Sequence, residues 1–329
     1  MPTSATLRGR RALPLLVAAL SFLPLTGARA ADPAGHVLDL KVGSAVSSLA
    51  VRLGGAGVVA SFSSCKVVFL DPALHVIRQS DIPRCQNLFT VRVGQSGEGE
   101  TVVASTYVGR AVLITGSHLT QYATHQAAVT DGFLVPGGLL TSSDDGSVRL
   151  LALDGGASTR TLATGVGVNR VLLPDPAATA GQPGFFAGFD TGQIQAVQGP
   201  RTRRYDSGVG RINALALSPD RHALLVAGFD GRVRSIDRAT GQARDLLATG
   251  AAVNALALDS TGTRLAAVND AGHLVVLQLG DNSRIVDAKV TDAAASAVAF
   301  GASGDTVLVG DGNGLLHEIP LPGAPLRQP

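Results

Sequence analysis

The feature that most constrains the fold of this chain is a short apolar segment that occurs seven times. Successive copies begin 39 to 44 residues apart. A period of about 40 residues, with short apolar runs and Gly-rich turns, is typical of four-stranded propeller blades. The sequence therefore predicts an all-β, seven-bladed β-propeller with four antiparallel strands per blade. The copies read VSSLAV, CQNLFT, VTDGFL, VNRVLL, INALAL, VNALAL and ASAVAF, and they begin at Val46, Cys85, Val129, Val168, Ile212, Val253 and Ala295.

Turn chemistry supports four strands in each repeat. The first strand is followed by a polar turn such as Ser218-Pro-Asp220, and a second apolar strand then leads to a turn built on Asp or Gly. Asp145-Gly146 and Asp230-Gly231 are two of these later turns. Such pairs supply the positive φ that a tight hairpin needs. A third strand and a weaker fourth strand complete the repeat.

These turns resemble those of WD40 repeats over about residues 36–322. The resemblance rests on Asp145-Gly-Ser-Val-Arg-Leu150, on Asp230-Gly-Arg-Val-Arg234 and on the Ser-Pro-Asp turn. His125 stands four residues before Val129, where the family's Gly-His dipeptide places its histidine. The family's strand-ending Asp is matched by Asp71, Asp154 and Asp237.

The chain also departs from the WD40 pattern, because it contains no Trp and most of its repeats lack the histidine. The resemblance implies the propeller fold. It also implies that the hydrogen-bond network inside the family's blades is limited here to the third blade, through His125, Asp145 and Ser147.

The two ends of the repeat region predict how the ring closes. His36–Gly43 precedes Val46 in the way that Ala243–Gly250 precedes Val253. We therefore expect the N-terminal stretch to form the outer strand of the last blade, whose three inner strands come from 295–320. Such a closure leaves only short strand edges exposed.

Residues 1–30 have the features of a secretory signal. Arg8, Arg10 and Arg11 form a basic region, 12–25 is apolar, and Ala28-Arg-Ala30 matches a cleavage site. The apolar run is short for a membrane span and contains two prolines. We expect cleavage after Ala30, a propeller over 31–322 with no stable membrane anchor, a disordered tail over 323–329, and a periplasmic or secreted location.

Charge argues against nucleic acid as a partner. The first 30 residues hold four Arg and no acid, so removing them changes the net charge from +2 to −2. A chain of that balance has no general attraction for phosphate backbones. One cluster of Arg201, Arg203 and Arg204 does not alter this expectation.

We expect a disulfide between Cys65 and Cys85, the two cysteines of the chain. Aligned hairpin turns place Cys65 where Gly146 and Gly192 stand in other repeats, and Cys85 opens the second repeat. Propeller topology brings both to one face, and paired cysteines are usual in exported proteins. Two buried free thiols are the alternative.

The second residue of the repeated segment is polar in every repeat. Inner strands line the central channel of a propeller, so these side chains are expected to ring its mouth. Alternatively, they cap backbone groups where the chain enters each strand. The residues are Ser47, Gln86, Thr130, Asn169, Asn213, Asn254 and Ser296.

Three arginines and three phenylalanines are candidates for a partner-binding face. Arg84, Arg170 and Arg211 lie beside the expected channel mouth, with Asp131 near enough in sequence to neutralise one of them. Phe62, Phe189 and Phe229 stand near turns on the same face. Arg and aromatic side chains dominate protein-binding hot spots. The alternatives are solvated loop arginines and phenylalanines that pack between blades.

Catalytic motifs are absent from the sequence. The histidines lack zinc-site spacing, and no haem-attachment, nucleophile-elbow or Walker motif occurs. The Asp-rich turns offer too few oxygen ligands for calcium. No cofactor or metal is therefore expected. The chain is interpreted as an exported, non-catalytic scaffold or accessory subunit that binds a periplasmic protein. The alternatives are a lactonase-like hydrolase or cofactor-dependent dehydrogenase with its site at the channel mouth, and a small-molecule sensor.

Overall fold

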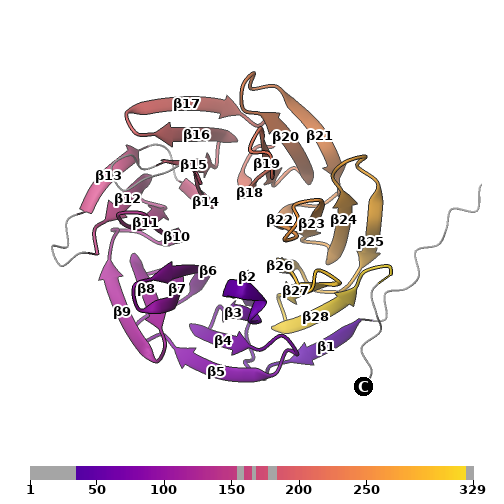
Figure 1. Ribbon diagram of the computed structural model, residues 1–329, viewed down its shortest axis with the longest axis horizontal. Coiled ribbons are helices and arrows are strands. Elements are labelled where there is room, and N and C mark those ends of the chain that lie inside the picture. Colours follow the sequence, from indigo (N-terminus) through magenta and orange to yellow (C-terminus); the bar gives the residue numbers. More distant parts are fainter. Residues whose placement is uncertain (1–34, 154–158, 165–167, 177–183, 324–329) are drawn as a thin grey trace, which may run out of the picture. The chain divides into compact units, whose positions relative to one another are not determined.

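The computed structural model describes residues 35–153, 159–164, 168–176 and 184–323, without the side chains of 164 and 168–172. All of them belong to one compact unit, Asp32–Pro329. The expected signal (1–30) and nearly all of the expected disordered tail (324–329) lie outside the described residues. Seven four-stranded antiparallel sheets stand around a central channel (Figure 1), so the predicted seven-bladed propeller is confirmed.

The strands follow one another from the channel to the rim in six blades. Blade 1 is β2 (Val46–Val51), β3 (Val58–Phe62), β4 (Lys66–Leu70) and β5 (Val76–Asp81), with a single 3-10 turn at Leu53–Gly55. Blade 2 is β6 (Leu88–Ser96), β7 (Gly99–Thr106), β8 (Arg110–Thr115) and β9 (His118–Ala123). Blade 3 is β10 (Val129–Val135), β11 (Gly138–Ser143), β12 (Ser147–Leu151) and β13 (Thr159–Thr164). Blade 4 is β14 (Val168–Pro174), β15 (Gly184–Phe189), β16 (Gln193–Gln198) and β17 (Arg201–Asp206). Blade 5 is β18 (Ile212–Leu217), β19 (Ala223–Gly228), β20 (Arg232–Asp237) and β21 (Ala243–Ala248). Blade 6 is β22 (Val253–Leu258), β23 (Arg264–Asn269), β24 (His273–Gln278) and β25 (Arg284–Lys289).

Blade 7 combines the two ends of the described chain. Its inner strands are β26 (Ala295–Phe300), β27 (Thr306–Asp311) and β28 (Leu315–Pro320), and its outer strand is β1 (His36–Asp39). β1 pairs antiparallel with β28, from His36 opposite Glu318 to Asp39 opposite Leu315. The predicted closure is confirmed. The strand ends earlier than expected because the Asp39 carboxylate accepts the N–H of Lys41, whose φ is 57°.

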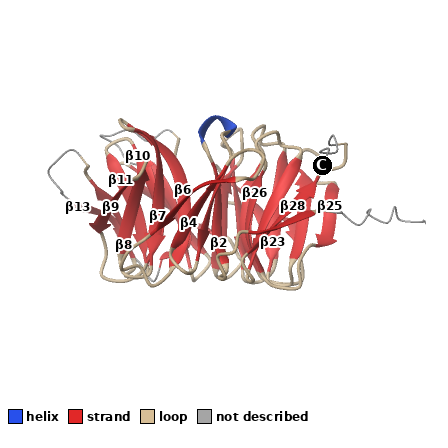
Figure 2. Cartoon of the chain, turned by 90° about the horizontal axis from the view of Figure 1, so that it is seen from below, coloured by secondary structure: helices blue, strands red, loops and turns tan. Residues whose placement is uncertain are grey.

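Antiparallel pairing gives the ring two distinct faces, which Figure 2 shows edge-on. We call one the loop face. It carries the connections into each inner strand and the turns between second and third strands, such as 63–65 and 229–231. The opposite face carries the remaining turns, such as 218–222 and 238–242.

The core is divided among the interfaces between neighbouring blades. Each adjacent pair shares a cluster of buried apolar side chains, and the cluster between blades 7 and 1 contains Phe62, Leu316 and Val46. Small residues allow the sheets to approach. A Cβ added to Gly310 would lie 2.4 Å from a methyl carbon of Val46. Close packing between blades therefore stabilises the ring.

A β-bulge occurs near the start of every inner strand. In blade 1, for example, Val46 pairs with Phe62 but Ser48 pairs with Ser61, which leaves Ser47 as the extra residue. A shift of one residue also occurs in blades 2, 3, 5, 6 and 7, and blade 4 has a shift of two residues between Val168 and Leu172. The bulge accommodates the polar second residue in six of the repeats, because an extra residue leaves the sheet pairing; in blade 2 this position is Phe89.

The second repeat begins three residues later than the sequence alignment placed it. Leu88, not Cys85, pairs with the end of the neighbouring strand, Thr106. Cys85 is held in a disulfide, and Arg84 and Gln86 on either side have φ values of 56° and 86°. The chain therefore enters the strand only after this left-handed segment. With Leu88 as its start, the repeat lies 42 residues from Val46 and 41 from Val129.

Candidate functional site

The inner strands enclose a cavity of about 260 Å³ at the loop-face end of the channel. Four of the predicted ring residues line it: Ser47, Asn213, Asn254 and Ser296. Gln86 does not, because it lies outside β6 and is exposed; Phe89 occupies the bulge position of blade 2. The side chain of Asn169 is outside the described part of the chain. The predicted polar ring is thus interrupted at blade 2, and also at blade 3, where Thr130 does not line the cavity.

Three ring side chains bind the backbone of the next blade. Asn213 Nδ2 donates to the Val253 carbonyl (2.9 Å), and Asn254 Nδ2 donates to the Ala295 carbonyl (3.0 Å). Across the closure, Ser296 Oγ donates to the Val46 carbonyl at 2.5 Å. In each case the acceptor is the first residue of the following inner strand. These side chains therefore satisfy backbone groups of the following blade, which differs from the local caps proposed as the alternative, and they link blades 5, 6, 7 and 1.

The other two described ring residues bond within their own blades. Ser47 Oγ lies 2.8 Å from Ser61 Oγ, and Thr130 Oγ1 lies 3.0 Å from Ser142 Oγ. Thr130 is buried and does not line the channel cavity.

Arg92 is a channel residue that the sequence analysis missed. Its guanidinium forms a forked contact with Asp131, with Nε 3.0 Å from Oδ1 and Nη2 2.8 Å from Oδ2, and lies 5.0 Å from the centre of the Phe133 ring. Asp131 is fully buried and also accepts a bond from Thr90 Oγ1. Asp131 therefore forms an ion pair with Arg92. The sequence alignment begins the second repeat at Cys85 and therefore does not assign Arg92 to its inner strand. With Leu88 as the start, Arg92 is a charged residue within that strand, β6.

Two of the three candidate phenylalanines are not on the surface. Phe62 is fully buried between blades 7 and 1, and Phe189 is buried between blades 3 and 4. Each pairs with the first residue of its inner strand, Val46 or Val168. Phe229 is one residue further along, beyond the end of β19, and is 64% exposed. Since strand side chains alternate between faces, this one-residue difference separates core from surface. Phe62 and Phe189 therefore pack between blades, as the alternative interpretation expected, and neither is part of the candidate binding face.

Phe229 and Arg211 lie together on the loop face. The Phe229 N–H donates to the Arg211 carbonyl at 2.9 Å. The Arg211 side chain is half exposed, and its Nε is 3.8 Å from Asp190 Oδ1. Arg84 is also exposed on this face, while the Arg170 side chain is outside the described residues. Arg211 and Phe229 thus remain as a pair that a partner can reach.

Tyr107 is an exposed aromatic that the sequence analysis missed. It is 54% exposed and occupies the same turn position in blade 2 as Phe229 does in blade 5. Its N–H donates to the Asn87 carbonyl at 3.0 Å, and its ring centre is 6.1 Å from that of Phe89. Alignment of the turns after the second strand would have revealed it.

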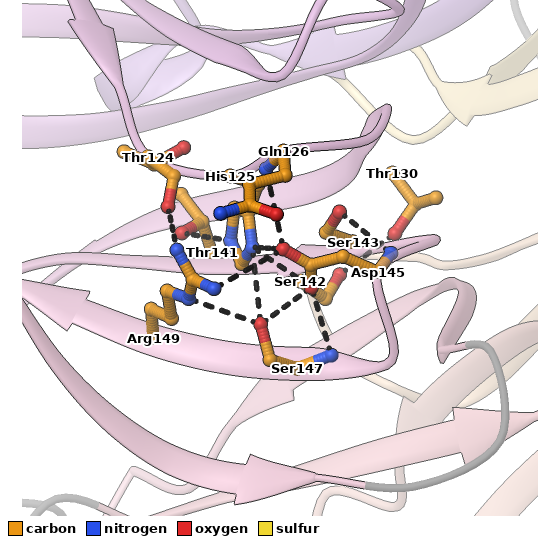
Figure 3. Close-up of polar contacts among 10 residues, drawn as sticks. All are labelled: Thr124, His125, Gln126, Thr130, Thr141, Ser142, Ser143, Asp145, Ser147 and Arg149. Atoms are coloured by element: carbon orange, nitrogen blue, oxygen red, sulfur yellow. Dashed lines mark hydrogen bonds and ion pairs between the residues drawn. The ribbon is translucent and has the colours of Figure 1, made fainter.

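Blade 3 contains the hydrogen-bond network that the resemblance implied (Figure 3). Asp145 accepts bonds from Ser147 Oγ (2.5 Å) and contacts His125 Nδ1 (3.0 Å), while His125 Nε2 lies 2.9 Å from Thr141 Oγ1. Burial lowers the pKa of His125, and Asp145 restores it only in part, so the ring is neutral at neutral pH. Arg149 supplies the positive charge, with Nη2 3.3 Å from Asp145 Oδ2.

Burial by itself would raise the pKa of the Asp145 carboxyl. The Ser147 hydroxyl, His125 and the Gln126 N–H oppose it and hold the pKa of Asp145 at about 2. Asp145 therefore remains ionised throughout the neutral range and anchors the network. These contacts connect the turn of blade 3 to the loop before β10, which is a structural role.

A different Asp–His network stabilises blade 7. Asp311 is fully buried, and its Oδ2 lies 2.9 Å from His317 Nε2 and accepts a bond from Thr291 Oγ1 at 2.7 Å. Burial tends to raise the pKa of Asp311, but His317 and Thr291 lower it below its usual value. Sequence reasoning did not predict this pair, which forms because β27 and β28 lie side by side.

The predicted disulfide is present. Cys65 and Cys85 are bonded, with their Cα atoms 6.0 Å apart, and both cysteines of the chain are used. Cys65 has a φ of 69°, at the turn position where Gly109, Gly146 and Gly231 have φ values of 75° to 79°. The bond joins the first hairpin turn of the loop face to the connection between blades 1 and 2.

Among the described residues, no group of three or more His, Cys, Asp or Glu side chains is arranged to hold a metal ion. Nor does the described part of the chain contain a helix with the length and apolar character needed to cross a membrane.

No protein-family model and no curated protein matches the sequence. The propeller fold is therefore established by the structure alone.

Proposed function

We propose that this protein is an exported, non-catalytic propeller that binds a partner protein through its loop face. The observation that supports this most is the pairing of Phe229 with Arg211. Phe229 is the most exposed large apolar side chain among the described residues, and its backbone is bonded to Arg211. Exposed aromatics beside Arg are the residue types that carry most binding energy at protein interfaces.

The loop face offers further contact residues around this pair. Tyr107, on blade 2, is a second exposed aromatic residue of this face. Arg84 is exposed between blades 1 and 2. Flat aromatic rings bury much apolar area at a small entropic cost, while guanidinium groups form forked bonds with carboxylates. The partner that fits this chemistry has apolar depressions bordered by acidic side chains.

Two observations support export and a likeness to WD40 propellers. A disulfide persists in oxidising compartments, which agrees with a periplasmic or secreted location for the Cys65–Cys85 bond. The His125–Asp145–Ser147 network of blade 3 has the residues that the WD40 resemblance implies. A scaffold or accessory role is consistent with both.

The test begins with capture of the partner from the extracytoplasmic fraction of the source cells, its identification, and a Kd measurement with both proteins purified. We expect Arg211→Ala and Phe229→Ala each to weaken binding by about 30-fold, equivalent to roughly 2 kcal/mol. The control variant combines Arg284→Ala with Leu119→Ala. It removes an arginine paired with Asp287 and an exposed leucine, both from outer strands.

Loss of binding in the control alone would place the interface on the rim and contradict the proposal. The enzyme alternative has its own readout. If the wild type retains no partner but hydrolyses a lactone or reduces a dye, a catalytic site replaces the binding face as the explanation.

A further inference from the structure

A basic groove lies between blades 4 and 5 on the opposite face of the ring. Its cavity is about 810 Å³, which exceeds that of the channel mouth. Four arginines line it: Arg201, Arg203, Arg221 and Arg238. Arg201 and Arg203 belong to the cluster at 201–204, which in the sequence was too small to indicate nucleic-acid binding.

Strand alternation places the first two arginines in the groove. Tyr205 of β17 is buried in the cluster between blades 4 and 5, so Arg203 and Arg201 face blade 5 with it. Arg204 faces the other way and does not line the cavity. The outer strand of blade 4 thus forms one basic wall.

Hydrogen bonds hold Arg203 and Arg238 in fixed positions within the groove. Arg203 donates to the carbonyls of Arg238 (2.6 Å) and Ala239 (2.8 Å), and its guanidinium lies 4.9 Å from the Tyr205 ring centre. Arg238 donates to the Arg221 carbonyl at 2.6 Å and lies 4.9 Å from the Phe186 ring centre. These contacts order the groove without neutralising its charge, because carbonyls and rings carry no net charge.

Two carboxylates also line the groove, and each has contacts of its own. Asp237 accepts bonds from the Thr240 N–H and hydroxyl, which lower the pKa of its carboxyl. Asp175 lies 3.6 Å from Arg238. Among the described residues, no ion pair joins Arg201 or Arg221 to a carboxylate, and both are exposed. In addition, Arg238 Nε is buried and has no hydrogen-bond partner.

We propose that this groove binds a compact ligand with two or more oxyanion groups. Guanidinium groups bind carboxylate and phosphate through paired hydrogen bonds. Of the four here, Arg238 is paired with Asp175, while no ion pair among the described residues joins Arg201, Arg203 or Arg221 to a carboxylate. The volume falls in the range of small-molecule sites. Arg201 and Arg221 supply the free donors, one from each blade, so the ligand bridges the blades. This site is independent of the loop face.

The experiment measures binding by isothermal titration calorimetry with two probes, inorganic tripolyphosphate and citrate, at constant ionic strength. They distinguish phosphate from carboxylate as the preferred oxyanion. We expect the double variant Arg201→Gln/Arg221→Gln to weaken binding of the preferred probe at least tenfold. Arg204→Gln removes a charge from the same strand without touching the groove, and should leave the affinity unchanged.

Three results would overturn the inference. The first is that the wild type binds neither probe, and the second is that Arg204→Gln loses as much affinity as the double variant. The third is that single-stranded DNA binds at the same site more tightly than both probes. Phe229→Ala is included as a separate reference. Because Phe229 lies on the other face, its variant should bind the probes normally even if the proposed partner binding fails.

Discussion

Asp145 is the acceptor on which the polar contacts of blade 3 converge. It receives the Ser147 hydroxyl and the N–H groups of Gln126 and Ser147, and it contacts His125 and Arg149. Hydrogen bonds to an ionised group contribute more to stability than those between neutral groups. One carboxylate therefore holds the turn of this blade against the preceding loop.

We expect Asp145→Asn to lower the free energy of unfolding by about 2 kcal/mol at pH 7, because an amide accepts fewer and weaker bonds. The stabilising effect of Asp145 depends on pH, because the fold lowers the pKa of its carboxyl. The ionised carboxylate stabilises the fold fully above about pH 4, and this contribution is lost as the pH falls toward 2. The difference between wild type and variant, measured by urea unfolding, should therefore shrink over that interval.

Asp230→Asn is the matched control for this prediction. Asp230 occupies the same turn position in blade 5, but it accepts the Arg232 N–H at 3.0 Å and has no histidine partner. A change within about 0.5 kcal/mol is expected there, as for most surface substitutions. Equal losses in the two variants would show that the blade 3 network adds no stability of its own.

At the scale of the element, the disulfide fastens the second hairpin turn of blade 1 to the loop that leads to blade 2. It closes a loop with a sequence separation of 20 residues. In the chain-entropy estimate, such a cross-link stabilises the native state by about 3 kcal/mol. Cys85→Ala should therefore lower the free energy of unfolding by about that amount, measured by urea unfolding without reductant.

The backbone at Cys65 makes a second, separable prediction. Its left-handed φ of 69° suits Gly better than any residue with a Cβ. Of two variants that both lack the disulfide, Cys65→Gly/Cys85→Ala should be more stable than Cys65→Ala/Cys85→Ala by about 1 kcal/mol. If the alanine variant is the more stable one, the left-handed turn is not conserved after the bond is removed.

The ring as a whole depends on β1. This strand covers the edge of β28, and Leu38, Leu40 and Val42 pack against the cluster between blades 7 and 1. Deleting residues 36–42 should expose that edge and lose about 5 kcal/mol, a fall in Tm on the order of 10 °C, with aggregation. Calorimetry and light scattering measure both effects. A deletion variant that melts like the wild type would contradict the closure, whereas removing the residues after Pro322 should change almost nothing.

Local features of the sequence were sufficient to determine the architecture, the disulfide and the strand that closes the ring. The repeated apolar segment and the Asp-Gly turns predict strands and hairpins, because both depend on residues close in the chain. The likeness of His36–Gly43 to Ala243–Gly250 predicted the closing strand. The same turn alignment placed Cys65 at a glycine position on the face of Cys85. Each of these inferences needs only the order of strands and the face on which a turn lies.

Only the tertiary structure decided which side chains are available. Phe189 is buried and Phe229 is exposed, because a shift of one residue along a strand turns a side chain to the other face. Arg92 meets Asp131, and Arg201 shares a groove with Arg221, across the interface between two blades. Such contacts depend on bulges and on the distance between neighbouring sheets, and neither is encoded in the spacing of residues along one strand.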